Sequence, residues 1–195
     1  LHKVFNEFGF GNKTNVDIPN ESKGLVPNRD YLMKRYGKYG WSKGTLLNLA
    51  IGQGELLVTP MQVLNYINLI ATQGNSPSCH FVMVDNLPSN CKPKLEKEHW
   101  DQVYEGLSAA IISNKGTGKK SDPSIDGLKI YGKTGTAENP HGDNHAWFTG
   151  WAEYLDNKYS IVILLENAGS GGSVAAPIAK LIFKEIINDQ SLASK

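Results

Sequence analysis

The sequence has few cysteines, no excess of either charge and no long apolar run. The formal net charge of the 195 residues is +1, so the composition gives no reason to expect a nucleic acid or a strongly acidic partner. The longest unbroken apolar run, Ile161–Leu165, is far too short to cross a bilayer. Hydrophobic residues make up 40% and charged residues 20% of the chain, which is typical of a folded globular protein with a buried core.

The two cysteines, Cys79 and Cys91, lie in one irregular stretch of the chain. They are either two free thiols in a loop or hairpin or, if the chain is exported, a disulfide pair. A metal site built from Cys79, His80 and Cys91 is disfavoured, because it lacks a fourth ligand and has no standard spacing.

Two other patterns suggest a ligand but are better explained without one. His141, Asp143 and His145 lie close together in the sequence, but loop histidines are common in proteins without a metal. The segment Lys115–Lys120 is rich in glycine, but it lacks the preceding strand and following helix that a phosphate-binding loop requires. We interpret that segment as a mobile connection and expect no metal and no other cofactor.

Apolar residues at helical spacing predict several helices separated by long connections. The predicted helices are Leu1–Phe8, Asp30–Tyr36, Thr59–Gly74, Glu96–Ser113 and Ser173–Ile187. The clearest begins at Thr59, which can cap it, with Pro60 at the first helical position and Gln62 completing a capping box. The terminal residues Asp189–Lys195 are expected to fray.

The connections are predicted from their glycine, proline and asparagine content. Gly11–Pro27 is predicted to be a loop at the surface, and Gly52-Gln53-Gly54 is predicted to be a tight turn. The irregular stretch Ser76–Lys97 contains a candidate short strand at His80–Val84.

The second half of the sequence predicts three adjacent antiparallel strands. Leu128–Gly132 alternates apolar and polar residues, and Ala146–Tyr154 and Lys158–Glu166 follow it. Ile161–Leu165 is apolar throughout, which predicts a strand buried on both faces. Asp156-Asn157-Lys158 suits a hairpin turn between the last two strands. The expected fold is an α/β (α+β) sandwich in which helices cover a mostly antiparallel sheet.

Directly after the first strand stands the tetrapeptide Lys133-Thr134-Gly135-Thr136. Because side chains alternate along a strand, the hydroxyls of Thr134 and Thr136 should face the same way, with Lys133 on the other side. Gly135 has no side chain, so a ligand can approach the backbone there. The sequence therefore predicts that these four residues form the wall of a site for a substrate carboxylate.

This tetrapeptide resembles the third motif of the penicillin-recognising acyl-transfer enzymes, the penicillin-binding proteins and serine β-lactamases. Other segments stand in the order seen in class B penicillin-binding proteins, and the nearest resemblance is to the penicillin-binding protein 2 group of cell elongation. These segments are Gly9-Phe10-Gly11, Asp17-Ile18-Pro19-Asn20-Glu21, Gly52-Gln53-Gly54 with Thr59-Pro60-Met61-Gln62, His145-Ala146-Trp147-Phe148-Thr149-Gly150, and Glu166-Asn167. Together they extend the resemblance over nearly the whole chain.

The resemblance also implies two motifs upstream of the third, and neither stands in a suitable place here. Ser-x-x-Lys, which carries the family's nucleophile, occurs only at Ser89–Lys92, between Pro88 and Pro93, where no helical pattern is present. Ser-x-Asn does not occur at all. We therefore expect residues 1–195 to be the C-terminal portion of a single transpeptidase domain, with the nucleophile-bearing portion and a membrane anchor outside this chain.

The activity implied by the resemblance is that of a peptidoglycan D,D-transpeptidase, which cross-links D-Ala-D-Ala stem peptides by serine acyl transfer and is a target of β-lactams. In that activity Lys133, Thr134, Gly135 and Thr136 would bind substrate, and Lys133 and Thr136 would also act in catalysis. The chain by itself is expected to be inactive. Two alternatives remain open at this point: a non-catalytic peptidoglycan-binding or structural remnant, and a β-lactamase-like hydrolase of the same fold.

The partners implied by the resemblance are peptidoglycan stem peptides, β-lactams and the missing N-terminal part of the same protein. A glycosyltransferase and proteins of the elongation complex are also implied, and nucleic acid is not. The implied location is the periplasmic face of the bacterial inner membrane.

Overall fold

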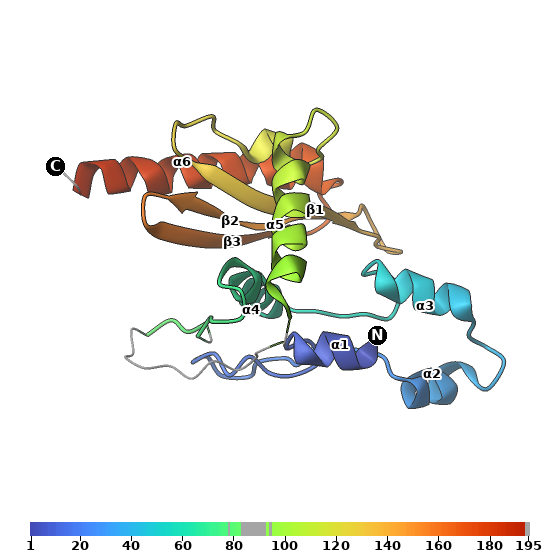
Figure 1. The fold of residues 1–195 in the computed structure, drawn as a ribbon. Helices are drawn as coiled ribbons and strands as arrows, with labels where there is room; N and C mark the ends of the chain where they lie inside the picture. Colours follow the sequence, from blue (N-terminus) through green and yellow to red (C-terminus); the bar gives the residue numbers. More distant parts are fainter. Residues whose placement is uncertain (78, 83–92, 94, 194–195) are drawn as a thin grey trace. The chain divides into compact units, whose positions relative to one another are not determined.

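The structure is a computed structural model that describes residues 1–77, 79–82, 93 and 95–193. It divides into two compact units, Leu1–Pro93 and Lys94–Lys195. Helices and loops make up the first unit, whereas the second contains the sheet (Figure 1). Among the helices that the structure describes, none combines the length and apolar character needed to cross a bilayer.

The described residues of the first unit form four helices. They are α1 (His2–Glu7), α2 (Arg29–Tyr36), α3 (Lys43–Ala50) and α4 (Pro60–Ala71). Three of them match predicted helices, but α3 was not predicted. A capping box begins α3, since Ser42 Oγ accepts from Gly44 N at 3.1 Å and Thr45 Oγ1 accepts from Ser42 N at 3.2 Å.

The predicted capping box of α4 is confirmed and has a second role. Thr59 N donates to Gln62 Oε1 at 2.9 Å, and Gln62 N donates to Thr59 Oγ1 at 3.1 Å. The buried Gln62 amide also donates to the carbonyls of Asn12 and Lys23, at 2.8 and 2.9 Å. The Gln62 side chain thus anchors both ends of the loop that was predicted to lie at the surface.

Two carboxylates in this loop fasten it further. Glu21 accepts from the backbone N–H of Thr14 at 2.7 Å and from that of Asn15 at 3.0 Å. Asp17 accepts from the N–H groups of Phe81 and Val82, at 2.6 and 2.7 Å. These two backbone donors hold the pKa of the Asp17 carboxyl below its ordinary value. Asp17 and Glu21 therefore stabilise the loop conformation within the first unit.

The second unit contains the predicted three-stranded antiparallel sheet, in the order β1 (Lys129–Ala137), β2 (His145–Tyr154) and β3 (Asn157–Leu165). Strand β1 is longer than predicted and includes the whole Lys-Thr-Gly-Thr tetrapeptide. The register pairs Lys133 with Thr149 and Gly135 with Trp147.

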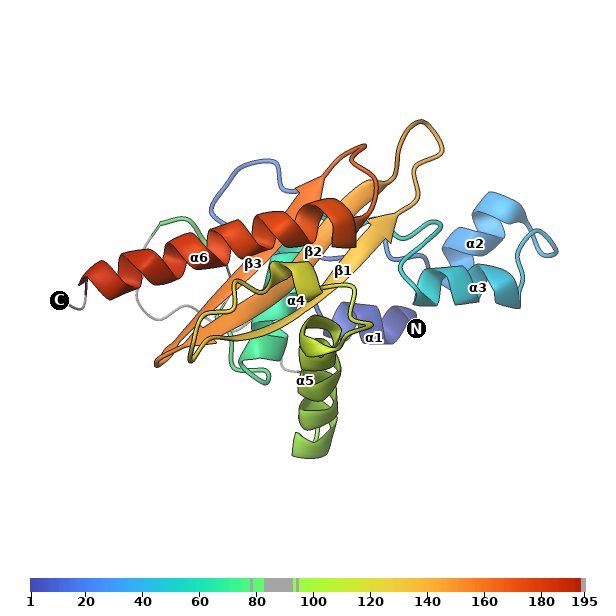
Figure 2. The same cartoon turned by 90° about the horizontal axis from the view of Figure 1, so that it is seen from above.

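Helix α6 (Ala176–Ala193) lies along one face of this sheet, and α5 (Lys97–Ile112) runs beside β1 (Figure 2). The core between the sheet and α6 centres on Phe148 and Phe183, whose rings meet edge to face with centroids 6.4 Å apart. Two short turns complete the unit, the 3₁₀ helix η1 (Lys119–Ser121) and the π-helical turn η2 (Gly171–Ala175).

The structure corrects two predictions about β3. The hairpin turn consists of Leu155 and Asp156, since Tyr154 pairs with Asn157. Of the β3 residues only Ile163 is buried, so the prediction of a strand buried on both faces was wrong. Ile161, Ile163 and Leu165 belong to the core under α6, and the other apolar residues of the strand alternate to the opposite face.

Two further corrections concern the end of the chain and the irregular stretch. Helix α6 continues to Ala193, so the prediction of fraying from Asp189 was wrong for most of that segment. The described part of the candidate strand His80–Val84 is a bend, and its last two residues lie outside the described residues. Ser89, proposed above only as a disfavoured nucleophile, also lies outside them, as does Cys91. Cys79 is a free cysteine whose Sγ accepts from Asn68 Nδ2 at 3.2 Å.

Candidate active site

Strand β1 carries Thr134 and Thr136 on one face, as predicted, and both line a hollow of about 470 Å³. The lining residues are Gly116, Thr117, Lys119, Lys120, Thr134, Thr136, Ser170, Gly172 and Ser173. They include hydroxyl-bearing residues and two lysines, and none of them is acidic. Such a lining suits an anionic group, because a carboxylate accepts hydrogen bonds and is attracted to cations.

Lys133 and Gly135 do not line this hollow. Lys133 Nζ donates to the Thr134 carbonyl at 2.9 Å, so its charged end turns back toward the strand backbone. Gly135 faces Trp147, and a Cβ added at Gly135 would lie 3.2 Å from Trp147 Cβ. The lysines that line the hollow are instead Lys119 and Lys120, which were not among the predicted site residues.

Each threonine hydroxyl has a partner from another segment. Thr134 Oγ1 lies 2.7 Å from Thr117 Oγ1, and either oxygen can be the donor. Thr136 Oγ1 accepts from the backbone N–H of Gly171 at 3.3 Å. The loop after α5 and the turn η2 thus both contact the tetrapeptide, and together they form the rest of the hollow.

Glycines allow these segments to approach one another. A Cβ on Gly171 would lie 2.3 Å from the carbonyl oxygens of both Gly135 and Trp147, and a Cβ on Gly172 would lie 2.9 Å from the Thr117 carbonyl oxygen. Side chains at these positions would collide with backbone atoms, which cannot move aside as the end of a flexible side chain can. The glycines therefore allow η2 to pack directly against the sheet and against the loop that carries Thr117.

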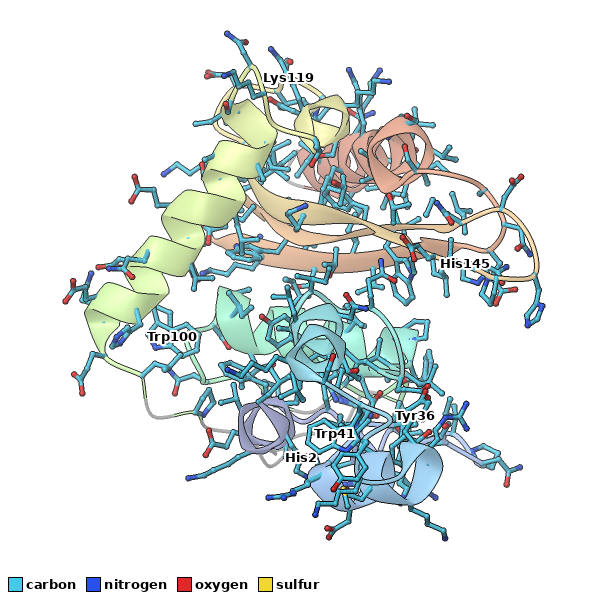
Figure 3. The ribbon with its side chains drawn as sticks, turned by 90° about the vertical axis from the view of Figure 1, so that its right-hand side faces the viewer. His2, Tyr36, Trp41, Trp100, Lys119 and His145 are labelled. Atoms are coloured by element: carbon cyan, nitrogen blue, oxygen red, sulfur yellow. The ribbon has the colours of Figure 1, made fainter. Side chains whose placement is uncertain are left out.

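The loop between α5 and β1 is fastened to its surroundings, in contrast to the mobile connection that was predicted. Ser121 is fully buried and donates to the Gly118 carbonyl at 2.8 Å. Gly118 N donates to the Ala110 carbonyl at 3.0 Å, and Lys119 Nζ donates to Asn114 Oδ1 at 2.9 Å. In Figure 3 Lys119 lies beyond the end of α5, on the same side of the sheet as α6.

His145 has a structural role in the described part of the chain. Its Nδ1 accepts from Asn167 N at 3.0 Å, while Asn139 Nδ2 donates to Asn167 Oδ1 at 2.6 Å. Figure 3 shows His145 at the β1–β2 loop end of the sheet, well away from Lys119. Among the described residues, no group of three or more His, Cys, Asp and Glu side chains is arranged to hold a metal ion.

An aromatic cluster supports β1 on the face opposite the hollow. Tyr131 stacks on Trp151 with ring centroids 4.7 Å apart, and Tyr104 of α5 contacts both rings. Burial raises the pKa of the Tyr104 and Tyr131 hydroxyls. Lys158 and Glu153 border this cluster as an ion pair at 2.9 Å. Burial lowers the pKa of Lys158, but its hydrogen bond to Glu153 and the nearby Tyr104 raise it by more.

A second hollow, of about 280 Å³, lies within the first unit. It is lined by Asn6, Phe8, Gly9, Asn12, Lys13, Thr14, Asn15, Gln62, Asn65, Leu69, Ser76 and Pro77. Its buried polar side chains, Thr14, Gln62 and Ser76, hydrogen-bond within the chain. The hollow is therefore interpreted as a packing gap beside the loop that Gln62 and Glu21 anchor, and not as a ligand site.

The protein-family model for the penicillin binding protein transpeptidase domain matches residues 1–186 of this sequence. The chain belongs to this family. Peptidoglycan D,D-transpeptidase MrdA of Haemophilus influenzae is 30% identical over 217 aligned positions, which cover 97% of this chain and 33% of that relative. The family resemblance inferred from the sequence motifs is thus confirmed, and the chain spans about a third of the length of the curated relatives it matches.

Solved structures of this transpeptidase family agree with the fold. Penicillin-binding protein 2 of Pseudomonas aeruginosa, in complex with WCK 5153, matches with a TM-score of 0.78 and 30% identity, over 93% of this chain and 41% of that one. Penicillin-binding protein 2 of Helicobacter pylori, in complex with MreC, matches with a TM-score of 0.77 and 32% identity, over 94% of this chain and 35% of that one. The predicted arrangement of helices on an antiparallel sheet is therefore confirmed as part of a transpeptidase fold.

Proposed function

We propose that this chain forms the carboxylate-binding wall of a peptidoglycan D,D-transpeptidase site. The observation that carries the proposal is the hollow beside β1, where the hydroxyls of Thr134 and Thr136 lie together with Lys119 and Lys120. A stem peptide that ends in D-Ala-D-Ala has a terminal carboxylate, and burying that group without donors is costly. Hydroxyl donors and nearby cations offset this cost.

The reaction would proceed through an acyl-enzyme. A serine hydroxyl attacks the penultimate D-Ala carbonyl and loses its proton to a base, and the tetrahedral intermediate expels the terminal D-Ala as its amine takes up a proton. An amine of a neighbouring stem peptide then attacks the ester and loses a proton. This forms the amide cross-link, and the serine oxygen leaves and takes up a proton. The backbone N–H of Thr136 would donate to the oxyanion, and Lys133 would supply positive potential and assist proton transfer. Penicillins resemble the D-Ala-D-Ala end and leave the serine acylated.

In the whole protein, this chain would be the C-terminal portion of one transpeptidase domain. The serine, its lysine base and a membrane anchor would belong to other parts of the same protein. The site would lie on the extracytoplasmic face of the inner membrane, where peptidoglycan is cross-linked. The partners would be stem peptides, β-lactams, a glycosyltransferase and elongation-complex proteins. The solved complex of the Helicobacter pylori relative with MreC supports the last of these.

Acylation of the full-length protein that contains this chain tests the proposal. Benzylpenicillin should add its mass stoichiometrically to the denatured protein, and peptide mapping should locate the adduct outside residues 1–195. Thr134→Val and Thr136→Val should each slow acylation by about tenfold or more, because a hydrogen bond to a charged group contributes about 1.5–3 kcal/mol.

Thr149→Val is a matched control, since Thr149 Oγ1 is buried and has no hydrogen-bond partner among the described residues. This variant should react at the wild-type rate. Absence of any adduct would contradict the transpeptidase assignment, and an adduct on Ser89 would place the nucleophile inside this chain. Rapid release of hydrolysed penicillin would favour a β-lactamase-like hydrolase.

A further inference from the structure

We propose that Thr117 is a positioning residue, which donates its hydroxyl hydrogen to Thr134 Oγ1 and thereby directs the Thr134 hydrogen toward the substrate carboxylate. The inference deepens the proposed function and rests on it. Thr117 lies outside the tetrapeptide, in the loop between α5 and η1, and it lines the same hollow as Thr134.

The geometry places the two hydroxyls in direct contact. The two Oγ1 atoms lie 2.7 Å apart and belong to residues 17 positions apart in the sequence. This separation is the usual one for a hydrogen bond between hydroxyl groups. Both side chains reach the hollow, so a ligand in it would meet a pair of coupled hydroxyls at this point.

The direction of the hydrogen bond follows from the chemistry of the ligand. A threonine hydroxyl has one hydrogen and two acceptor lone pairs, whereas an ionised carboxylate only accepts. When Thr134 donates to the carboxylate, its oxygen can only accept from Thr117. The order Thr117 to Thr134 to carboxylate is therefore the one arrangement that uses both contacts, and successive hydrogen bonds of this kind strengthen one another.

The position of Thr117 is fixed by its neighbours in the chain. Gly116 and Gly118 pack so closely on the end of α5 that an added Cβ on either would lie 2.4 or 3.1 Å from the Ala110 carbonyl oxygen. The buried Ser121 holds the Gly118 carbonyl. On the other side, Gly172 approaches the Thr117 carbonyl closely. The backbone of Thr117 is thus held in place before a ligand binds, which favours a positioning role for its hydroxyl.

Two substitutions in the full-length protein separate this role from a purely structural one. Thr117→Val keeps the shape of the side chain and removes the hydroxyl, and Thr117→Ser keeps the hydroxyl. The probes are benzylpenicillin, which has a carboxylate, and its methyl ester, which has none. The measurement is the second-order rate constant of acylation for each probe.

Thr117→Val should lose about tenfold in rate with benzylpenicillin, as expected for one hydrogen bond in a charged network. It should change the rate with the methyl ester by less than about twofold, and Thr117→Ser should restore the wild-type rate with the acid. Equal losses with both probes would show that Thr117 only stabilises the loop, and no loss with benzylpenicillin would also overturn the inference.

The wild-type protein separates failure of this inference from failure of the proposed function. If the wild type reacts equally fast with the acid and the ester, the hollow does not recognise a carboxylate, and both proposals fail. If the wild type prefers the acid and Thr117→Val keeps that full preference, only the role of Thr117 fails.

Discussion

A hydroxyl group can donate to a ligand only if its single hydrogen is not already used in another hydrogen bond. The two threonines of β1 differ in the partners that their hydroxyls have. Thr134 meets another hydroxyl, which can reverse its role between donor and acceptor. Thr136 meets the backbone N–H of Gly171, which can only donate. A backbone donor fixes the orientation of Thr136 whether or not a ligand is present, whereas the orientation of Thr134 depends on the ligand and on Thr117.

A second residue-scale consequence concerns Tyr66 of α4, whose ring packs against Phe8 and Phe10 with centroids 5.5 and 5.2 Å apart. Burial raises the pKa of the Tyr66 hydroxyl. Because the folded state disfavours the tyrosinate, this group's contribution to stability is fully present below its unfolded pKa of about 10 and is lost as the pH rises through the folded pKa.

We therefore expect alkaline pH to destabilise the wild type more than Tyr66→Phe, which cannot ionise at this position. Urea unfolding at intervals between about pH 7 and pH 11 measures the difference in free energy between the two proteins. The difference should be constant at neutral pH and should move in favour of Tyr66→Phe above about pH 10. A difference that does not change with pH would show that the Tyr66 hydroxyl titrates normally in the folded protein.

The position of turn η2 depends on Gly171, which has no side chain. An added Cβ on Gly171 would lie 2.3 Å from two backbone oxygens of the sheet, so Gly171→Ala should push the turn away from β1. This would break the contact of Gly171 N with Thr136 and cost at least about 2 kcal/mol of stability, as severe overpacking does. Acylation by benzylpenicillin should slow in parallel.

Gly106→Ala is the matched control, because Gly106 lies inside α5 and an added Cβ there meets nothing within 4 Å. Alanine in a helix interior is favoured over glycine by about 0.5–1 kcal/mol, so this variant should be slightly more stable than the wild type. Thermal unfolding and acylation rates of the two variants check the prediction. Equal stability of Gly171→Ala and the wild type would mean that the turn can shift at no cost.

Local signals predicted the elements whose shape is decided within a few residues. Thr59, Pro60 and Gln62 predicted the start of α4, and alternation predicted β1. Helix α3 was missed although Ser42 and Thr45 form a capping box, because the segment is short and its apolar residues show no clear helical stripe. Its capping box has Thr45 where the usual sequence pattern has Glu or Gln, so the start of the helix carries no standard capping signal.

Only the part of the candidate site that lies on strand β1 could be predicted from the sequence. Thr134 and Thr136 follow from their spacing on a strand, but Thr117 reaches Thr134 through the fold of a glycine-rich loop. Such a loop looks mobile in a sequence, because glycine permits many conformations. Only the structure shows that Ser121 and the tight packing of the glycines select one of them. The cations of the hollow were missed for the same reason.

At the scale of the whole molecule, apolar side chains remain at the surface of the described residues. The end of α3 is the plainest case, since Leu47 is 66% exposed and Ile51 is 68% exposed. Residues four apart on a helix lie next to one another, so these two side chains form one apolar patch. Exposed apolar patches commonly mediate association between protein surfaces.

We expect the 195-residue chain, produced by itself, to associate through this patch. Light scattering coupled to gel filtration should give a mass above that of the monomer, rising with protein concentration. Leu47→Lys combined with Ile51→Lys should shift the chain toward the monomer, because charged side chains there would have to be desolvated in an interface. Leu155→Lys provides the control, since Leu155 is 73% exposed at the hairpin turn of the second unit. A wild-type chain that stays monomeric at every concentration, or a control that dissociates it equally well, would show that the α3 patch does not drive association.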